Sequence, residues 1–200
     1  MPSRPKGLAT AMRRRGFSVY LRPPRNSDAR AFLGAVKASR KLHGGWVQPP
    51  TTPKRFAQFV RRFGGATKRN PLAATHVGFL VCRCEDDAIV GVFNLSEIVR
   101  GLFQSAYLGY YAFSPYAGAG YMAEGLELTL GVAFRALKLH RVEANIQPAN
   151  LRSLALARDA GFVREGLSRR YVRIAGRWRD HVRMALLAED SRTRSKLRPP

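Results

Sequence analysis

The sequence predicts one mixed domain of the α/β (α+β) class, with about seven strands in a central sheet and about four flanking helices. Its 200 residues are 46% hydrophobic, which is enough for one core in a chain of this length. Alternating strand-like segments give way to helical spacing and back several times along the chain. No stretch approaches the roughly 20 uncharged apolar residues of a membrane-spanning helix. Residues 1–20 lack the apolar region of a signal peptide, so we expect a soluble, cytoplasmic protein with no membrane contact.

The first part of the chain is predicted to hold one strand and two helices. The strand stops where two prolines interrupt its alternation, and each helix begins after a polar residue that can cap it. The predicted elements are a strand over 17–22, a helix over 28–41 capped by Asn26 or Ser27, and a helix from Pro53 to Phe63 capped by Thr52 and ended by Gly64-Gly65.

The rest of the chain is predicted to add an antiparallel group of three strands, two helices separated by a strand, and a final hairpin. Acidic and glycine-containing turns separate the strands, and a glycine ends the last helix. In order, these elements are strands over 76–84, 89–100 and 105–113, a helix over 121–137, a strand over 141–147, a helix over 150–160 ended by Gly161, and strands over 162–174 and 178–187 joined at Ala175-Gly176.

The chain is strongly basic, with 35 Lys and Arg against 13 Asp and Glu and a net charge of +22. The charge divides the chain into a basic extension over 1–16, the folded domain over 17–189 and a basic tail over 190–200. The domain itself is basic, so we expect a persistent positive potential that attracts phosphate-rich partners such as RNA. A compositional preference for Arg, which outnumbers Lys 28 to 7, is the alternative explanation.

The two cysteines, Cys82 and Cys84, lie two residues apart on a predicted strand and therefore point to the same face. No other cysteine completes a zinc site, so we interpret them as core thiols and predict no metal.

A glycine turn at Gly118-Ala119-Gly120 lies between a predicted strand and a predicted helix. Glycines let the backbone approach a ligand closely, and the first N–H groups of a helix form an anion site suited to a pyrophosphate. The N–H groups of Gly118, Gly120, Tyr121 and Met122 are the candidates. Taken alone, the same residues also fit a tight turn with no ligand.

About thirty residues later, Asn150, Ser153 and Gly161-Phe162 form the pattern N-x-x-S-x₇-G-F. In this order the two motifs resemble the GNAT superfamily of acetyl-CoA-dependent N-acetyltransferases, over roughly residues 17–189. The ending Gly176-Arg-Trp-Arg-Asp-His-Val182 is similar to the RimJ/RimL branch, and most of all to its RimJ type. Members of that branch acetylate the N-terminal α-amine of ribosomal proteins, the RimJ type on an alanine.

This resemblance implies acetyl-CoA as the co-substrate, held in a V-shaped opening between the fourth and fifth strands. The usual Gln or Arg at the head of the superfamily turn is replaced by Pro115, and a basic residue common between the glycines is replaced by Ala119. Arg152, or the general positive field of the chain, is the candidate to compensate for both losses. The implied cofactor-binding residues are Tyr111, Ala112, Phe113, Gly118, Ala119, Gly120, Tyr121, Met122, Asn150 and Arg152.

For catalysis, the resemblance assigns Ser153 to protonating or hydrogen-bonding the leaving thiolate, with capping of the first turn of its helix as the alternative. Asn150 could equally be a plain N-cap of that helix. The glutamate that acts as base in a RimL-type enzyme corresponds to Val172, so that role does not transfer. Glu97 and Tyr171 are the candidate substitutes and acceptor-binding residues, and His181 is a third. Glu97 could equally form a surface ion pair with Arg100. The candidate wall of the peptide pocket is Trp46.

The leading function is therefore acetylation of the N-terminal α-amine, of Ala or Ser type, on a ribosomal or other protein by a monomer or homodimer. The basic surface is then a docking surface for ribosomal RNA. One alternative is an acetyltransferase for a small amine or antibiotic, although so basic a surface would repel a polycation. The other is a non-catalytic ribosome-assembly factor that binds RNA.

Overall fold

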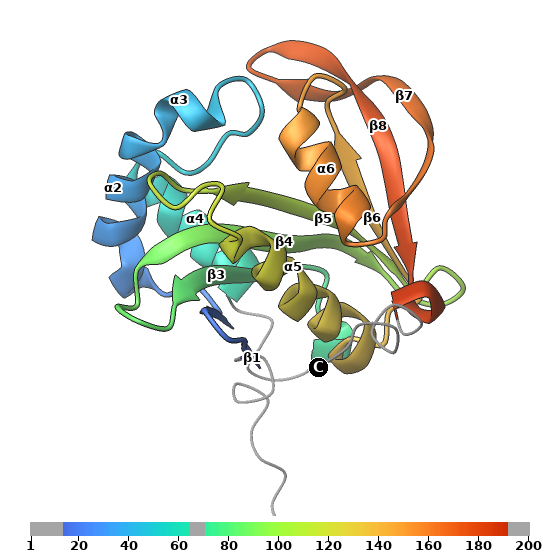
Figure 1. Ribbon diagram of the computed structural model, residues 1–200, viewed down its shortest axis with the longest axis horizontal. Helices are drawn as coiled ribbons and strands as arrows, with labels where there is room; N and C mark the ends of the chain where they lie inside the picture. Colours follow the sequence, from blue (N-terminus) through green and yellow to red (C-terminus); the bar gives the residue numbers. More distant parts are fainter. Residues whose placement is uncertain (1–13, 65–70, 192–200) are drawn as a thin grey trace, which may run out of the picture.

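A single eight-stranded sheet forms the centre of the computed structural model, which describes residues 14–64 and 71–191 (Figure 1). Neighbouring strands are antiparallel except β5 and β6, which are parallel. In spatial order the strands are β1 (Arg14–Arg15), β2 (Val19–Arg22), β3 (Val77–Arg83), β4 (Ile89–Val99), β5 (Ser105–Ala112), β6 (Arg141–Ile146), β8 (Arg177–Leu187) and β7 (Val163–Ile174).

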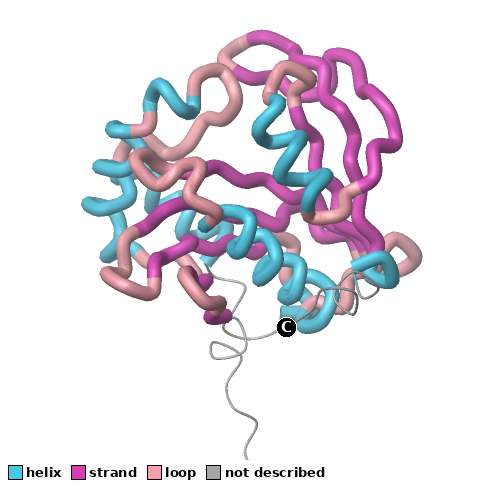
Figure 2. The backbone as a smooth tube through the Cα atoms, in the orientation of Figure 1, coloured by secondary structure: helices cyan, strands magenta, loops and turns pink. Residues whose placement is uncertain are grey.

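Helices flank the sheet (Figure 2), and the two hydrophobic clusters show which face each helix covers. α5 and α6 pack with one face, while α2 and α4 pack with the other. The helices are α2 (Ala29–Ala38), α3 (Arg40–His43), α4 (Pro53–Gly64), α5 (Tyr121–Gly131) and α6 (Leu151–Asp159), with short turns η1 (Asn26–Asp28), η3 (Pro71–Ala73) and the π-helical η4 (Val132–Ala136).

An aromatic cluster fixes α2 and α4 against the sheet. Phe32 of α2 is fully buried, and its ring centre lies 4.5 Å from that of Phe56 and 5.5 Å from that of Phe113. Burying each such ring contributes about 1.5–3 kcal/mol to folding. Phe113 directly follows β5, so this cluster positions the strand that carries the site described below.

The predicted fold class, strand order and hairpin are confirmed, and so are the caps of α4 and α6. The Thr52 Oγ1 accepts from the Arg55 N–H at 3.3 Å, and the Asn150 Oδ1 accepts from the Ser153 N–H at 3.2 Å. The eighth strand, β1, was not predicted. It pairs with β2 and lies within the segment expected to be an extension.

The single helix predicted over 28–41 is wrong, because it is divided at Ser39 into α2 and α3. The Ser39 Oγ donates to the Ala35 carbonyl at 2.7 Å and accepts from the Ser114 N–H at 2.9 Å. The predicted Asn26 or Ser27 cap is also wrong. The N-cap position of α2 is Asp28, whose side chain makes no capping bond to α2; its carboxylate instead accepts from the Arg25 N–H in η1 and pairs with Arg22.

The predicted opening between the fourth and fifth strands, β5 and β6, is confirmed. The two strands pair only from Ser105 to Tyr107 on β5 and from Arg141 to Glu143 on β6. Beyond that point they diverge, as Figure 1 shows to the left of their meeting point. The edge of β5 from Leu108 onward is thereby left open toward β6.

The remaining expectations concern the chain ends, the cysteines and metals. The basic extension and tail lie outside the described residues, apart from residues 14–16 and 190–191, and so does Gly65. Cys82 is buried in the α2 and α4 cluster, and burial raises the pKa of its thiol. Within residues 14–64 and 71–191, no three His, Cys, Asp or Glu side chains gather as metal ligands, and no helix is long and apolar enough to span a bilayer.

Candidate active site

The main cavity has a volume of about 940 Å³ and lies where β5 separates from β6. The turn before α5 lines one end, and α3, the loop after it and the start of α6 line the other, where the Gln147 side chain bonds to Gly45. The lining residues used below are Lys41, His43, Trp46, Val47, Tyr110, Tyr111, Ala112, Gly118, Gly120, Met122, Asn150, Arg152, Ser153 and Asp159.

The glycine turn forms one wall of this cavity. Gly118 has φ +89° and Gly120 has φ +82°, and a Cβ added at either would meet nothing within 4 Å. Gly120 caps the 11-residue α5, so the N–H groups of Gly120, Tyr121 and Met122 belong to the first turn, where no helical carbonyl is available. The turn is an open backbone cradle with the positive end of a helix dipole behind it, which fits a pyrophosphate.

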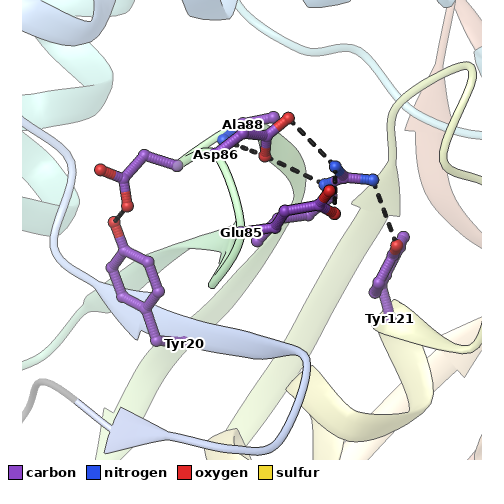
Figure 3. Close-up of polar contacts among 7 residues, drawn as sticks. Tyr20, Glu85, Asp86, Ala88 and Tyr121 are labelled. Carbon is purple, nitrogen blue, oxygen red and sulfur yellow. Dashed lines mark hydrogen bonds and ion pairs between the residues drawn. The ribbon is translucent and has the colours of Figure 1, made fainter.

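Arg83, at the end of β3, supports this turn through a cluster of charged and aromatic groups (Figure 3). Its guanidinium donates to Glu85 and Asp86 and, at 3.3 Å, to the Tyr121 hydroxyl. It also lies over the rings of Tyr116 and Tyr121, at 5.5 and 5.9 Å from their centres. The hydrogen bond to Asp86 raises the pKa of the Arg83 guanidinium, which is therefore charged at every pH at which the protein is folded. Sequence reasoning missed this residue, because its partners are brought together only by the fold.

Replacing Arg83 with Ala should therefore weaken acetyl-CoA binding while leaving the reacting end of the cavity intact. We expect the KM for acetyl-CoA to rise about 3- to 10-fold with kcat nearly unchanged, because the turn loses the cation–π and hydrogen-bond contacts of Arg83. Steady-state kinetics at varied acetyl-CoA concentration measures this. Arg30→Ala, at an exposed position on α2, is the matched control. An unchanged KM would show that the turn holds its shape without Arg83.

At the start of α6, Ser153 and Tyr110 form a hydroxyl pair inside the cavity. The Ser153 Oγ donates to the Tyr110 Oη at 2.7 Å, and the Tyr110 hydroxyl donates to the Ser153 carbonyl at 3.0 Å. Burial raises the pKa of Tyr110 to about 12, so both groups carry their protons at neutral pH. The pair can therefore pass a proton to an anion that enters beside Ser153.

Tyr110 was missed by sequence reasoning, although a signal was present. Side chains alternate along β5, and Ala106 and Leu108 face the cluster that contains α5 and α6. Tyr110 shares their face and so meets α6, whereas Tyr111 packs with the opposite cluster. The capping interpretation of Asn150 is confirmed, and the residue also lines the cavity beside Ser153.

The backbone of β5 offers hydrogen bonds along its open edge. The Phe113 N–H donates to the Val90 carbonyl, so odd-numbered residues direct their backbone groups to β4. Even-numbered residues face the β6 side, as the Gln104 carbonyl shows by accepting from the His140 N–H at 2.7 Å. The backbone groups open toward β6 are therefore those of Tyr110 and the N–H of Ala112, whose carbonyl already accepts from His43, rather than those of Tyr111 and Phe113.

The other end of the cavity is walled by α3 and its following loop, through Lys41, His43, Trp46 and Val47. The Gln147 Nε2 donates to the Gly45 carbonyl at 3.0 Å and ties this loop to the end of β6. Trp46 therefore lies where the sequence predicted a wall. Lys41 and His43 were not among the predicted site residues.

Several predicted residues lie away from this cavity. Phe113 is buried in the aromatic cluster, and Ala119 and Tyr121 belong to the turn without lining the cavity. Glu97 is 59% exposed and pairs with Arg62 and His76, each at 3.3 Å, rather than with Arg100.

Tyr171 and His181 lie on the final hairpin, with ring centres 6.0 Å apart, and neither lines the cavity. A hydrogen bond with Tyr107 raises the pKa of Tyr171 to about 12. A phenol with so high a pKa is a poor proton acceptor at neutral pH.

Comparison with known proteins identifies the family. The acetyltransferase (GNAT) domain family matches residues 18–163. A probable N-acetyltransferase, YjcK of Bacillus subtilis, is 31% identical over 88% of this chain and 97% of its own length. This chain belongs to the GNAT acetyltransferase family.

Three acetyltransferases are also similar to this GNAT chain. The [ribosomal protein uS5]-alanine N-acetyltransferase of Escherichia coli is 41% identical, over 53% of this chain and 55% of its own. Mycobacterium smegmatis RimJ, solved with CoA-disulfide, has a TM-score of 0.77 and 28% identity, covering 86% of this chain and 82% of its own. The ribosomal-protein-S5-alanine acetyltransferase of Vibrio fischeri also has a TM-score of 0.77, with 26% identity over 88% and 96% of the two chains.

As a GNAT acetyltransferase the protein uses acetyl-CoA, and the residues present fit that molecule. The open glycine cradle suits its pyrophosphate, and the free edge of β5 offers peptide-like hydrogen bonds along an extended arm. When bound, acetyl-CoA supplies an acetyl group activated as a thioester. Arg152 also lines the cavity and remains the candidate to replace the basic residue missing from the turn.

Proposed function

We propose that this enzyme acetylates the N-terminal α-amine of a ribosomal protein whose first residue is Ala or Ser. The observation that carries the proposal is the charge of the cavity. Among its described lining residues, Asp159 is the one acid, and it pairs with Arg158 at 3.0 Å, while Lys41 and Arg152 are basic. A polyamine or aminoglycoside needs several carboxylates, whereas a peptide brings a single amine. The named function of the Escherichia coli and Vibrio fischeri relatives supports the same substrate class.

The residues divide the work along the cavity. Backbone groups of Gly118, Gly120 and Met122 bind the pyrophosphate, and those of Tyr110 and Ala112 hold the extended arm. Ser153, backed by Tyr110, supplies a proton at the leaving sulfur. Trp46 forms an aromatic wall for the incoming peptide.

A panel of amines tests this function. Thiol release from acetyl-CoA is followed with peptides beginning Ala, Ser or Met, with an N-terminally blocked Ala peptide, and with spermidine and an aminoglycoside. Turnover on free Ala and Ser termini, with none on the blocked peptide, is the expected result. Faster turnover of spermidine or the aminoglycoside would replace this proposal with small-amine acetylation.

We also propose that the final hairpin, β7 and β8, docks on ribosomal RNA and so brings the enzyme to its substrate in the cytoplasm. Two acids accompany its arginines, but Glu165 pairs with Arg141 and Asp180 accepts the Arg170 N–H. Trp178 is 60% exposed among the arginines, as suits stacking on a base. The exposed arginines are Arg164, Arg169, Arg170, Arg173, Arg177, Arg179 and Arg183.

Reversing two of these charges should weaken RNA binding more than the same charge change elsewhere. For Arg173→Glu/Arg177→Glu we expect at least about a 10-fold higher Kd for ribosomal RNA, and a salt dependence reduced by about two phosphate contacts. Arg30→Glu/Arg61→Glu, on exposed positions of α2 and α4, changes the net charge equally. Equal weakening by both pairs, measured by filter binding across salt concentrations, would mean that the whole positive field and not the hairpin binds RNA.

A further inference from the structure

His43, the last residue of α3, is a buried imidazole at the acceptor end of the cavity. It is 6% exposed, and its ring packs edge-on against Tyr111 and Phe113, with centres 5.4 and 5.7 Å away. Its Nε2 lies 2.9 Å from the Ala112 carbonyl oxygen. The ring is thus held by three consecutive residues at the end of the open β5 edge.

The hydrogen bond to Ala112 decides which ring nitrogen carries the proton. A backbone carbonyl can only accept, so Nε2 must be the donor, and in the neutral ring Nδ1 then keeps its lone pair. Among the described residues, no hydrogen bond engages Nδ1. The fold therefore presents a fixed, unused proton acceptor on a ring that lines the cavity.

The surroundings keep this imidazole neutral. Burial lowers the pKa of His43, and this effect outweighs the opposing hydrogen bond to Ala112. The other titratable groups that line the cavity are Lys41, Tyr110, Tyr111, Arg152 and Asp159, and the neighbouring Arg40 lies on α3. Nδ1 is consequently available as a base at neutral pH.

A second observation points to a polar ligand beside His43. The Tyr111 Oη is buried and has no hydrogen-bond partner among the described residues. A buried hydroxyl without a partner is costly, and such groups are commonly satisfied by a ligand or an ordered water. Tyr111 also lines the cavity and packs against the His43 ring, so the unpartnered hydroxyl belongs to the same part of the cavity wall as the imidazole.

We infer that His43 Nδ1 is the general base that takes the proton from the acceptor amine. The inference rests on the proposed function, in which that amine is a peptide N-terminus. As the amine nitrogen bonds to the acetyl carbon, the C–S bond breaks; the nitrogen loses one proton to His43, and Ser153 gives one to the sulfur. The imidazolium proton then returns through solvent to the Ser153 and Tyr110 pair, so the protons balance. His43 thereby takes the role of general base, for which Glu97 and Tyr171 were the candidates although neither lines the cavity.

The dependence of kcat/KM on pH gives the signature of this base. An α-amine has a pKa near 8, and burial lowers the pKa of His43 from its ordinary value, so the two groups titrate separately and both must be deprotonated for attack. Below both values, log kcat/KM of the wild type should rise with pH at a slope of about 2, falling to about 1 between them. His43→Gln keeps an N–H for the Ala112 carbonyl but cannot accept a proton. We expect its kcat at neutral pH to fall about 100-fold and its slope to stay near 1 throughout.

Two further measurements distinguish a base from a packing residue. Added imidazole should restore part of the kcat of His43→Ala, and His140→Gln should behave as the wild type, because His140 is exposed and pairs with Glu189. If the wild type is active and His43→Gln shows the same slope of log kcat/KM against pH, the assignment of His43 as the base is overturned. The proposed function still stands in that case. A wild type silent toward every amine of the panel would overturn both.

Discussion

Gly120→Val is expected to abolish productive acetyl-CoA binding in a folded protein. A β-branched residue at φ +82° is strained by about 1–2 kcal/mol, and its side chain would occupy the open space of the pyrophosphate cradle. The chain offers no Gln or Arg at the head of the turn to compensate, since Pro115 stands there. We therefore expect the Kd for acetyl-CoA, measured by calorimetry, to rise at least about 100-fold.

Gly34→Ala is the matched control for this change. Gly34 lies on the exposed side of α2, and a Cβ there also meets nothing within 4 Å. Alanine should stabilise that helix by up to about 1 kcal/mol without altering binding. If Gly120→Val bound acetyl-CoA as tightly as Gly34→Ala, the pyrophosphate would have to bind elsewhere.

Ser153→Ala should lower kcat about 100-fold while leaving the KM for acetyl-CoA within about 3-fold. The backbone N–H of residue 153 keeps its bond to Asn150, so the start of α6 is preserved and only the proton donor is lost. Tyr110→Phe should lower kcat less, because Ser153 retains its own hydroxyl. Steady-state kinetics with an Ala-initiated peptide measures both.

The double variant shows whether the two hydroxyls act together. Ser153→Ala/Tyr110→Phe should be scarcely slower than Ser153→Ala alone, since Tyr110 acts through Ser153. Ser27→Ala, at an exposed position in η1, is the control for a serine outside the cavity. A kcat unchanged by Ser153→Ala would assign the proton to another donor or to water.

The features that could be predicted from the sequence are those that neighbouring residues specify. The glycine turn, the Asn150 cap and the glycine after α6 depend on local backbone geometry, and each lies where its pattern predicts. The break between α2 and α3 depends instead on Ser39 accepting from the Ser114 N–H, 75 residues away. No local pattern shows that bond.

Residues of the candidate site that belong to a local sequence motif were predicted. Residues that join the site only through contacts distant in the chain were missed. Glu97 was expected beside the opening, but the β4 register shifts between Ser96 and Val99, with Glu97 at φ +47°. Such a bulge redirects a side chain and leaves no clear mark in the sequence. His43 and Arg83 likewise acquire their roles from partners distant in the chain, namely Ala112 and Tyr121.

The most direct test of the central claim is to locate the acetyl group on a peptide that offers two amines. The enzyme is incubated with isotopically labelled acetyl-CoA and a peptide that begins with Ala and contains one internal Lys, and fragment masses locate the label. The account predicts a single label on the α-amine, about half of which is neutral near pH 8, whereas the lysine, with a pKa near 10.4, is almost entirely protonated. Label on the lysine side chain, or on both amines equally, would contradict it.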